Sequence, residues 1–202
     1  VLIFDECTSG FRQTFGGLHK MYGVEPDMCM FGKALGNGYG ITAVLGKRSV
    51  MEAAQKTFIS STFWTERIGP SAALATLDVM EKTKSWDIIT EIGSSITQRW
   101  ADLGKKYDLD VNTAGLPALT SFSIASEDWL KYKTFITQEM LKKGILASNS
   151  VYVCTEHKPE LVNRYFDELE PIFNTLSTCE KGDSDISSLL ESPVCHGGFK
   201  RL

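Results

Sequence analysis

The chain has 202 residues, of which 43% are hydrophobic and 23% charged, and its formal net charge is −4. This composition is typical of a globular protein, and the acidic balance argues against a nucleic-acid-binding surface, which would gather Lys and Arg. No apolar run approaches the ~20 residues that span a bilayer, so the sequence predicts no membrane segment. The 5 cysteines are scattered without a CxxC pair and the 3 histidines are well separated, which predicts no metal site and favours a reducing, cytoplasmic compartment.

Two apolar runs near the start of the chain each end in charged residues. Val1–Phe4 is followed by Asp5, and Met28–Phe31 is followed by Gly32 and Lys33. Short, continuously apolar runs are typical of buried parallel strands. Ligands bind at the carboxyl ends of strands in open α/β sheets. The sequence therefore predicts an α/β fold in which Asp5 and Lys33 face one crevice.

The next elements continue this α/β pattern. Residues 33–40 form a loop with three glycines, followed by a short strand at 41–45 and a short helix at 48–55. A hydroxyl-rich loop covers residues 60–65. An alanine-rich helix begins near Gly69-Pro70, because proline is favoured in the first turn of a helix.

The remainder of the chain alternates helices and strands. The expected elements are a helix capped by Ser85, a strand at 119–124, a helix at 127–143 that stops at Gly144, a strand at 151–154, and a helix that starts at Pro159. Pro171 lies inside the last helical pattern. Proline lacks the backbone N–H that an interior helical position donates, so we expect this helix to kink or split there.

The motifs at the two strand ends resemble those of the class III (subgroup II) pyridoxal-phosphate-dependent aminotransferases. The resemblance rests on D-E-x-x-S-G-F at residues 5–11, on Pro26-Asp27, and on Gly32-Lys33 with glycines after it. The spacing D-E-x-x-x-G-F-R at residues 5–12 is similar to the branch that contains glutamate-1-semialdehyde aminomutase. The likeness is firm from Val1 to about Leu77 and looser to about Leu176.

This resemblance implies a fold-type I transferase with two domains. Residues 1–85 would be the C-terminal part of a large domain with a mostly parallel sheet, together with a connecting helix. Residues 86–178 would be a small α+β domain, and residues 179–202 a polar linker and tail of unknown role.

The resemblance also implies roles for single residues. Lys33 would be the catalytic residue, holding pyridoxal 5'-phosphate as a Schiff base and then moving a proton as general base and acid. Asp5 would pair with the pyridinium nitrogen and keep it protonated. Cys7 stands where the family usually has a valine against the cofactor ring, and Thr62 would bind the cofactor phosphate across a homodimer interface. Thr8 replaces a glutamine near the phenolic oxygen, which leaves that contact open.

The loop around Thr62 departs from the family pattern. Where relatives carry G-N-P, this chain has Thr65-Glu66-Arg67, so the roles of Trp64, Glu66 and Arg67 stay open. Since the aminomutase branch usually keeps G-N-P, we favour an aminotransferase that moves an amino group from an amino donor to a carbonyl acceptor. Glutamate-1-semialdehyde 2,1-aminomutase is the alternative.

Two further interpretations stay open at this stage. An apolar run ending in Asp-Glu is also typical of a Walker B strand, although no GxxxxGK[ST] phosphate loop occurs in the chain. The chain also lacks an initiating Met and starts within an expected central strand. We therefore expect a longer natural protein whose first half precedes Val1; a natural start near Val1 would instead indicate a catalytically incompetent remnant or scaffold subunit.

Overall fold

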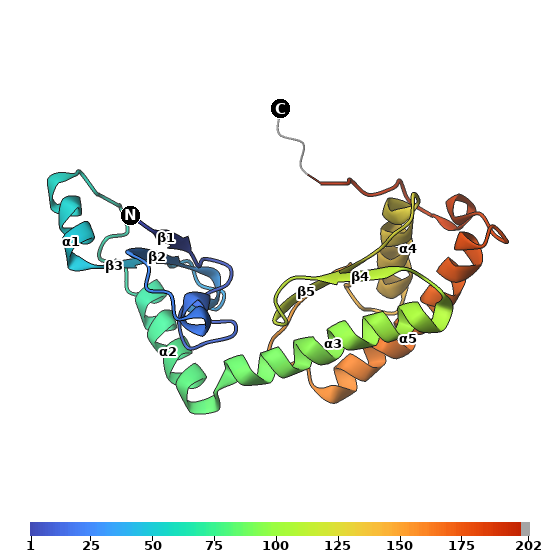
Figure 1. Ribbon diagram of the computed structural model, residues 1–202, viewed down its shortest axis with the longest axis horizontal. Coiled ribbons are helices and arrows are strands. Elements are labelled where there is room, and N and C mark those ends of the chain that lie inside the picture. Colours follow the sequence, from blue (N-terminus) through green and yellow to red (C-terminus); the bar gives the residue numbers. More distant parts are fainter. Residues whose placement is uncertain (199–202) are drawn as a thin grey trace. The chain divides into compact units, whose positions relative to one another are not determined.

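The computed structural model describes residues 1–198, so the last four residues of the expected tail lie outside the described part of the chain. The chain divides into two compact units, Val1–Thr90 and Glu91–Leu202 (Figure 1). We call them the N-terminal unit and the C-terminal unit and describe each by itself.

The N-terminal unit contains a three-stranded sheet in the order β1-β2-β3. Strand β1 (Ile3–Asp5) pairs in parallel with β2 (Met28–Phe31), with Phe4 opposite Cys29. Strand β3 (Ala43–Gly46) pairs antiparallel with β2. The parallel pairing expected for the two apolar runs is thus confirmed, and β3 makes the sheet mixed.

The helical segments of this unit are mostly short. They are η1 (Leu18–Tyr22), η2 (Lys33–Leu35), α1 (Arg48–Met51), η3 (Glu52–Lys56) and α2 (Ile68–Thr83). The single helix expected at 48–55 is therefore an α-helical turn followed by a 3-10 segment. Helix α2 packs beside the strands (Figure 1), and a small core forms between Cys29, Phe31, Leu35 and Ala73.

The C-terminal unit combines a second sheet with three long helices. Its elements are α3 (Ser85–Tyr107, which begins in the N-terminal unit), β4 (Val111–Ala114), β5 (Leu119–Ile124), α4 (Trp129–Lys142), β6 (Ser150–Tyr152), α5 (Pro159–Glu180) and η4 (Ile186–Leu189). The sheet order is β4-β5-β6 and both pairings are antiparallel.

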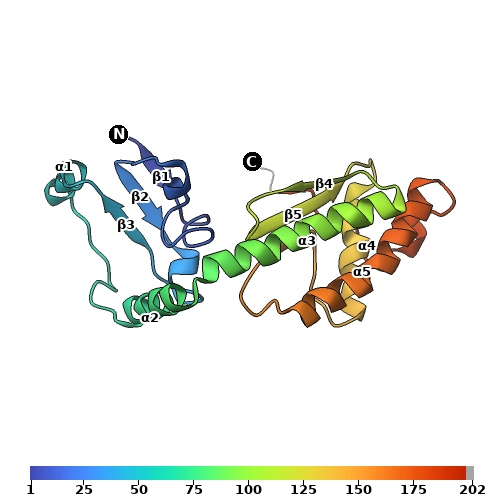
Figure 2. The same cartoon turned by 60° about the horizontal axis from the view of Figure 1, so that its bottom comes forward.

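Alternation along β5 creates the main core of this unit. Thr120, Phe122 and Ile124 are buried while the residues between them are less so, as period-2 side-chain geometry requires. The Phe122 ring lies 4.7 Å from the ring of Trp100 on α3 and 5.9 Å from that of Phe173 on α5. Helices α3 and α5 therefore cover this face of the sheet (Figure 2).

Helix α5 runs through Pro171 without a break, so the expected split does not occur. Pro171 removes one helical hydrogen bond, which costs stability in a helix interior. On either side of it, Leu169 and Phe173 are both completely buried. Their burial favours one continuous helix, because each apolar side chain removed from water contributes about 1.5–3 kcal/mol.

The segment expected to be a polar linker is packed against α4. Ile186 of η4 is only 2% exposed. Gln138 on α4 donates its Nε2 hydrogen to the carbonyl of Leu189 (3.0 Å) and accepts from the backbone N–H of Glu191 (2.7 Å). Farther along, the backbone N–H of Cys195 donates to the hydroxyl of Thr134 at 2.9 Å. One buried isoleucine and several hydrogen bonds between side chains and backbone hold this segment against α4. The amino-acid composition of the segment does not predict these contacts.

Within residues 1–198, no helix is both long and apolar enough to cross a lipid bilayer. The same part of the chain contains no group of three or more His, Cys, Asp or Glu side chains that could hold a metal ion.

Candidate active site

Asp5 and Lys33 lie at the same edge of the N-terminal sheet. Asp5 is the last residue of β1, while β2 ends at Phe31 and is followed by Gly32 and Lys33. Because β1 and β2 are parallel neighbours, their carboxyl ends point the same way. Both charged side chains are exposed, so a ligand can reach them.

The Lys33 amine is held by the loop that follows β1. Its Nζ donates a short hydrogen bond to the Thr8 hydroxyl. Lys33 also has a φ of 44°, in the left-handed region, which costs a non-glycine residue about 1–2 kcal/mol. Strained backbone of this kind gathers at functional sites. No local sequence pattern predicts a partner for Thr8, and only the pairing of β1 with β2 brings the two side chains together.

Asp5 and Cys7 form the other half of this cluster. The Cys7 backbone N–H donates to Asp5 Oδ1 at 3.0 Å. That bond, the Cys7 thiol and the Lys33 charge hold the pKa of the Asp5 carboxyl below its ordinary value. Partial burial and the neighbouring Asp5 raise the pKa of the Cys7 thiol. At neutral pH the cluster therefore presents a carboxylate beside a neutral thiol.

Thr62 is not linked to this cluster by any hydrogen bond in the described part of the chain. It lies in an exposed segment between η3 and α2. In the same segment, Glu66 accepts hydrogen bonds from the backbone N–H groups of Ile68 and Gly69. These N–H groups belong to the first turn of α2, where a carboxylate satisfies otherwise unpaired donors. Glu66 is thus a helix cap, a role that its place just before the helix could have revealed.

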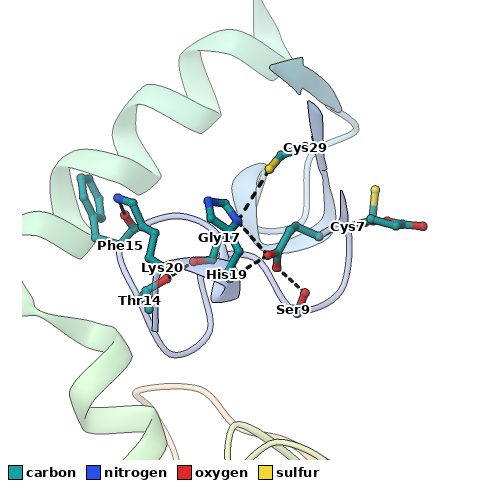
Figure 3. Close-up of polar contacts among 10 residues, drawn as sticks. Cys7, Ser9, Thr14, Phe15, Gly17, His19, Lys20 and Cys29 are labelled. Atoms are coloured by element: carbon teal, nitrogen blue, oxygen red, sulfur yellow. Dashed lines mark hydrogen bonds and ion pairs between the residues drawn. The ribbon is translucent and has the colours of Figure 1, made fainter. Parts of the chain in front are cut away.

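Glu6, which follows Asp5 in the chain, is buried, with 3% of its surface exposed. Its carboxylate accepts hydrogen bonds from Ser9 and from His19 (Figure 3). His19 was not selected from the sequence because a single histidine in a glycine-rich loop carries no recognisable pattern. These contacts are long-range within the loop, and only the fold makes them.

A cavity of about 570 Å³ lies in the N-terminal unit on the His19 side of the loop. Its lining includes Phe15, His19, Cys29 and Leu77, whereas Asp5 and Lys33 are not part of it. The cavity is therefore separate from the strand-end cluster of Asp5, Cys7, Thr8 and Lys33, and His19, a hydrogen-bond partner of Glu6, is part of the cavity wall.

The strand-end cluster has a definite chemical capability. An exposed lysine amine can act as a nucleophile or as a base when it is neutral. An ionised carboxylate one strand away can pair with a cationic group of a ligand. Cys7, a neutral thiol, adds a small apolar contact surface, and Thr8 orients the amine. The combination fits a planar, partly cationic ligand that reacts with an amine.

Comparison with known proteins points to the same family as the sequence motifs. Residues 1–163 match the aminotransferase class-III family. The chain is 32% identical over 166 residues to 3-aminobutyryl-CoA aminotransferase of Cloacimonas acidaminovorans, an alignment that covers 79% of this chain and 40% of that protein. It is 26% identical to glutamate-1-semialdehyde 2,1-aminomutase of Hyperthermus butylicus, with 87% of this chain and 45% of that protein covered. The chain thus spans less than half the length of these curated relatives.

Solved structures show the fold. The FumI protein of Sphingopyxis sp. MTA144 superimposes with a TM-score of 0.81 at 21% identity, covering 90% of this chain and 44% of that one. An S-selective transaminase from Arthrobacter sp. gives a TM-score of 0.75 at 20% identity, covering 89% and 46%. The expected fold-type I architecture is confirmed. Because the family match covers more than half of the chain, this protein belongs to the class-III aminotransferase family.

Proposed function

We propose that the protein containing this chain is a pyridoxal-phosphate-dependent aminotransferase with Lys33 as its catalytic lysine. One observation carries the proposal: Asp5 and Lys33 stand at neighbouring ends of two parallel strands, inside a region matched by the class-III family. The curated relatives include proteins named as aminotransferases and transaminases, which supports the reaction type.

The residues of the cluster fit the cofactor. The lowered pKa of Asp5 keeps a negative charge available for the protonated ring nitrogen. The Cys7 sulfur lies beside Gly32, 3.6 Å from the position that a Cβ there would take, and the neutral thiol would offer the cofactor ring a small apolar contact. Lys33 would hold the aldehyde carbon. Thr62, in its exposed loop, would supply a hydroxyl to the phosphate of a second subunit's cofactor.

Each residue then has a task in the reaction. Pyridoxal phosphate, when bound, supplies an aldehyde that condenses with amines and a ring that accepts electrons. Lys33 Nζ would act as general base and acid, taking up the proton from the Cα of the amino donor and later giving it back. Asp5 would hold a negative charge beside the ring nitrogen and so favour its protonated form. Thr8 Oγ1, which accepts from Lys33 Nζ, keeps the amine pointed at the reacting carbon.

The proposal extends to assembly, domains and location. The substrates would be a small amino donor and a carbonyl acceptor, and the enzyme would be a homodimer with its sites at the interface. Residues 1–85 would serve as cofactor-binding domain and residues 86–178 as the small domain, with 179–202 as an extension. Five free cysteines favour the reducing cytoplasm as its location.

Glutamate-1-semialdehyde aminomutase is the second candidate. Several relatives with that name align over 87–88% of this chain, more than the 79% for the aminobutyryl-CoA enzyme. An aminomutase would carry out both half-reactions on one carbon skeleton. The substituted loop at Thr65-Glu66-Arg67 favours the aminotransferase. The two candidates can be distinguished by giving the full-length protein its amino substrate without any carbonyl acceptor. An aminotransferase would then stop after one half-reaction, whereas an aminomutase would complete both.

The test uses the full-length protein with added pyridoxal phosphate. We expect a visible absorbance band that borohydride removes, leaving the cofactor attached to the peptide that contains Lys33. Lys33→Ala should lack the band, whereas Lys47→Ala, which removes an exposed lysine at the far end of the sheet, should keep it. A wild-type protein without a Lys33-dependent band contradicts the proposed function.

A further inference from the structure

The carboxylate of Glu6 is the buried charge nearest to the strand-end cluster. Its Oε2 accepts from the Ser9 hydroxyl at 2.5 Å, and its Oε1 accepts from the backbone N–H of His19 at 3.1 Å. His19 Nδ1 lies 3.1 Å from the same Oε1. In Figure 3, His19 reaches from its own loop toward Cys29 on one side and the carboxylate on the other. An isolated buried carboxylate is costly, so these partners decide whether it can stay there.

The ionisation of Glu6 fixes the direction of these bonds. Burial alone would raise the pKa of the Glu6 carboxyl, but the hydrogen bonds from Ser9 and His19 outweigh it and hold the pKa below its ordinary value. An ionised carboxylate can only accept, so His19 Nδ1 must carry a hydrogen and donate it. The Cys29 sulfur, 3.6 Å from Nδ1, is a weak second acceptor, because burial raises the pKa of this thiol and keeps it neutral.

Glu6 is covalently placed between two residues of the cluster, Asp5 and Cys7. Its backbone N–H donates to the carbonyl of Met30 on β2 at 2.8 Å, and its carbonyl accepts from the N–H of Gly10 at 2.8 Å. Strand β2 therefore fixes its backbone, while His19 fixes its side chain. Any shift of the Glu6 backbone would move its chain neighbours Asp5 and Cys7.

The loop leaves little room around this pair. A Cβ on Gly17 would lie 2.3 Å from the His19 ring and 3.0 Å from Glu6 Oε1. A Cβ on Gly10 would lie 2.6 Å from the Glu6 carbonyl and 2.6 Å from the Phe31 ring. Such distances are below van der Waals contact, so the two glycines are required for the loop to close over Glu6.

We propose that His19 is a positioning residue for the strand-end site: through its hydrogen bonds to Glu6 it fixes residues 7–19 so that Asp5, Cys7 and Thr8 face the Lys33 amine. This inference rests on the proposed function, since pyridoxal phosphate is the ligand whose binding the arrangement prepares. His19 touches neither Lys33 nor Asp5, and it acts only by way of Glu6.

The experiment compares His19→Leu and His19→Asn in the full-length protein. The first readout is the rate of tryptic cleavage after Arg12 and Lys20 in the cofactor-free protein, which reports local opening of the loop. The second is the dissociation constant for pyridoxal phosphate. His19→Leu should speed cleavage and weaken binding, each about tenfold, which for binding corresponds to about 1.4 kcal/mol. His19→Asn should restore both to within about threefold, because its amide nitrogen takes the position of Nδ1 and can still donate to Glu6.

Matched controls make each result decisive. His157→Leu, the same substitution in the C-terminal unit, should change neither readout. If His19→Leu binds the cofactor as tightly as wild type, the inference is overturned, even if its loop is cleaved faster. If His19→Leu does not fold, His19→Phe decides: it keeps a ring at this position but removes the Nδ1 donor to Glu6, and unchanged cleavage and affinity there overturn the inference. A wild-type protein that binds no pyridoxal phosphate contradicts the proposed function, and this inference with it.

Discussion

The two units of this chain differ in how completely they are packed. The C-terminal unit has a continuous core in which Trp100, Phe173 and Leu176 are entirely buried. The N-terminal unit has a core of four buried residues, while large apolar side chains on its strands and loops, such as Leu45 and Phe63, are 59% and 76% exposed. The candidate active site lies wholly in the less densely packed unit. Its geometry therefore draws on hydrogen bonds, such as those around the buried Glu6 carboxylate, as well as on apolar packing.

The largest expected effect is on the stability of the densely packed C-terminal unit. Trp100→Ala should lower the free energy of unfolding of the C-terminal unit by about 3–5 kcal/mol. The substitution empties a fully buried site and leaves the Tyr165 hydroxyl without the indole donor 3.0 Å away. Trp64→Ala, at a site 69% exposed, should stay within about 0.5 kcal/mol. Urea unfolding followed by circular dichroism measures both, and equal losses would contradict the contrast.

A smaller effect is expected at the proposed catalytic cluster of the N-terminal unit. Under the proposed function, Asp5→Asn should lower kcat/KM of the full-length protein about a hundred- to a thousandfold, because it would remove the charge proposed to stabilise a protonated ring nitrogen. Its effect on stability should be slight, since the side chain is exposed. Steady-state kinetics with an amino donor measures the change. Asp27→Asn, at the opposite end of β2 in an ion pair with Lys47, should retain near-wild-type activity. Comparable losses in both variants would argue against a specific role for Asp5.

The pH dependence of the N-terminal unit follows from the Glu6 carboxyl. Its pKa in the folded protein lies below the ordinary value of 4.5. The stability it contributes is therefore complete above pH 4.5 and is lost as the pH falls through the lower folded value. Hydrogen exchange of β1 and β2 amides at neutral and acidic pH measures the loss. In Glu6→Gln the loss should be smaller but not absent, because the pKa values of Asp5 and Asp27 are also lowered.

The smallest expected effect concerns the well-packed unit. Pro171→Ala should stabilise it by about 1 kcal/mol, because the new N–H can donate within α5. Pro159→Ala should bring no such gain, since the first turn of a helix has no partner for that N–H. Thermal unfolding separates the two variants. A destabilised Pro171→Ala protein would show that the ring packs better at this position than a methyl group.

Local patterns predicted most of the fold. Continuous apolar runs identified β1 and β2, a strand was expected at 119–124 where β5 lies, and Gly144 with Pro159 bounded α4 and α5. Strand β4 was missed because Val111–Ala114 contains a single apolar residue larger than alanine. Its assignment comes from the antiparallel pairing with β5, which no local pattern encodes.

The sequence by itself determined the family and placed Asp5 and Lys33 at strand ends, because strand-forming runs and their terminal charges are local features. The contact between Thr8 and Lys33 and the burial of Glu6 under His19 were decided only by the tertiary structure. They join residues that no periodicity relates, and they exist because β1 pairs in parallel with β2 and the intervening glycines let the loop fold back.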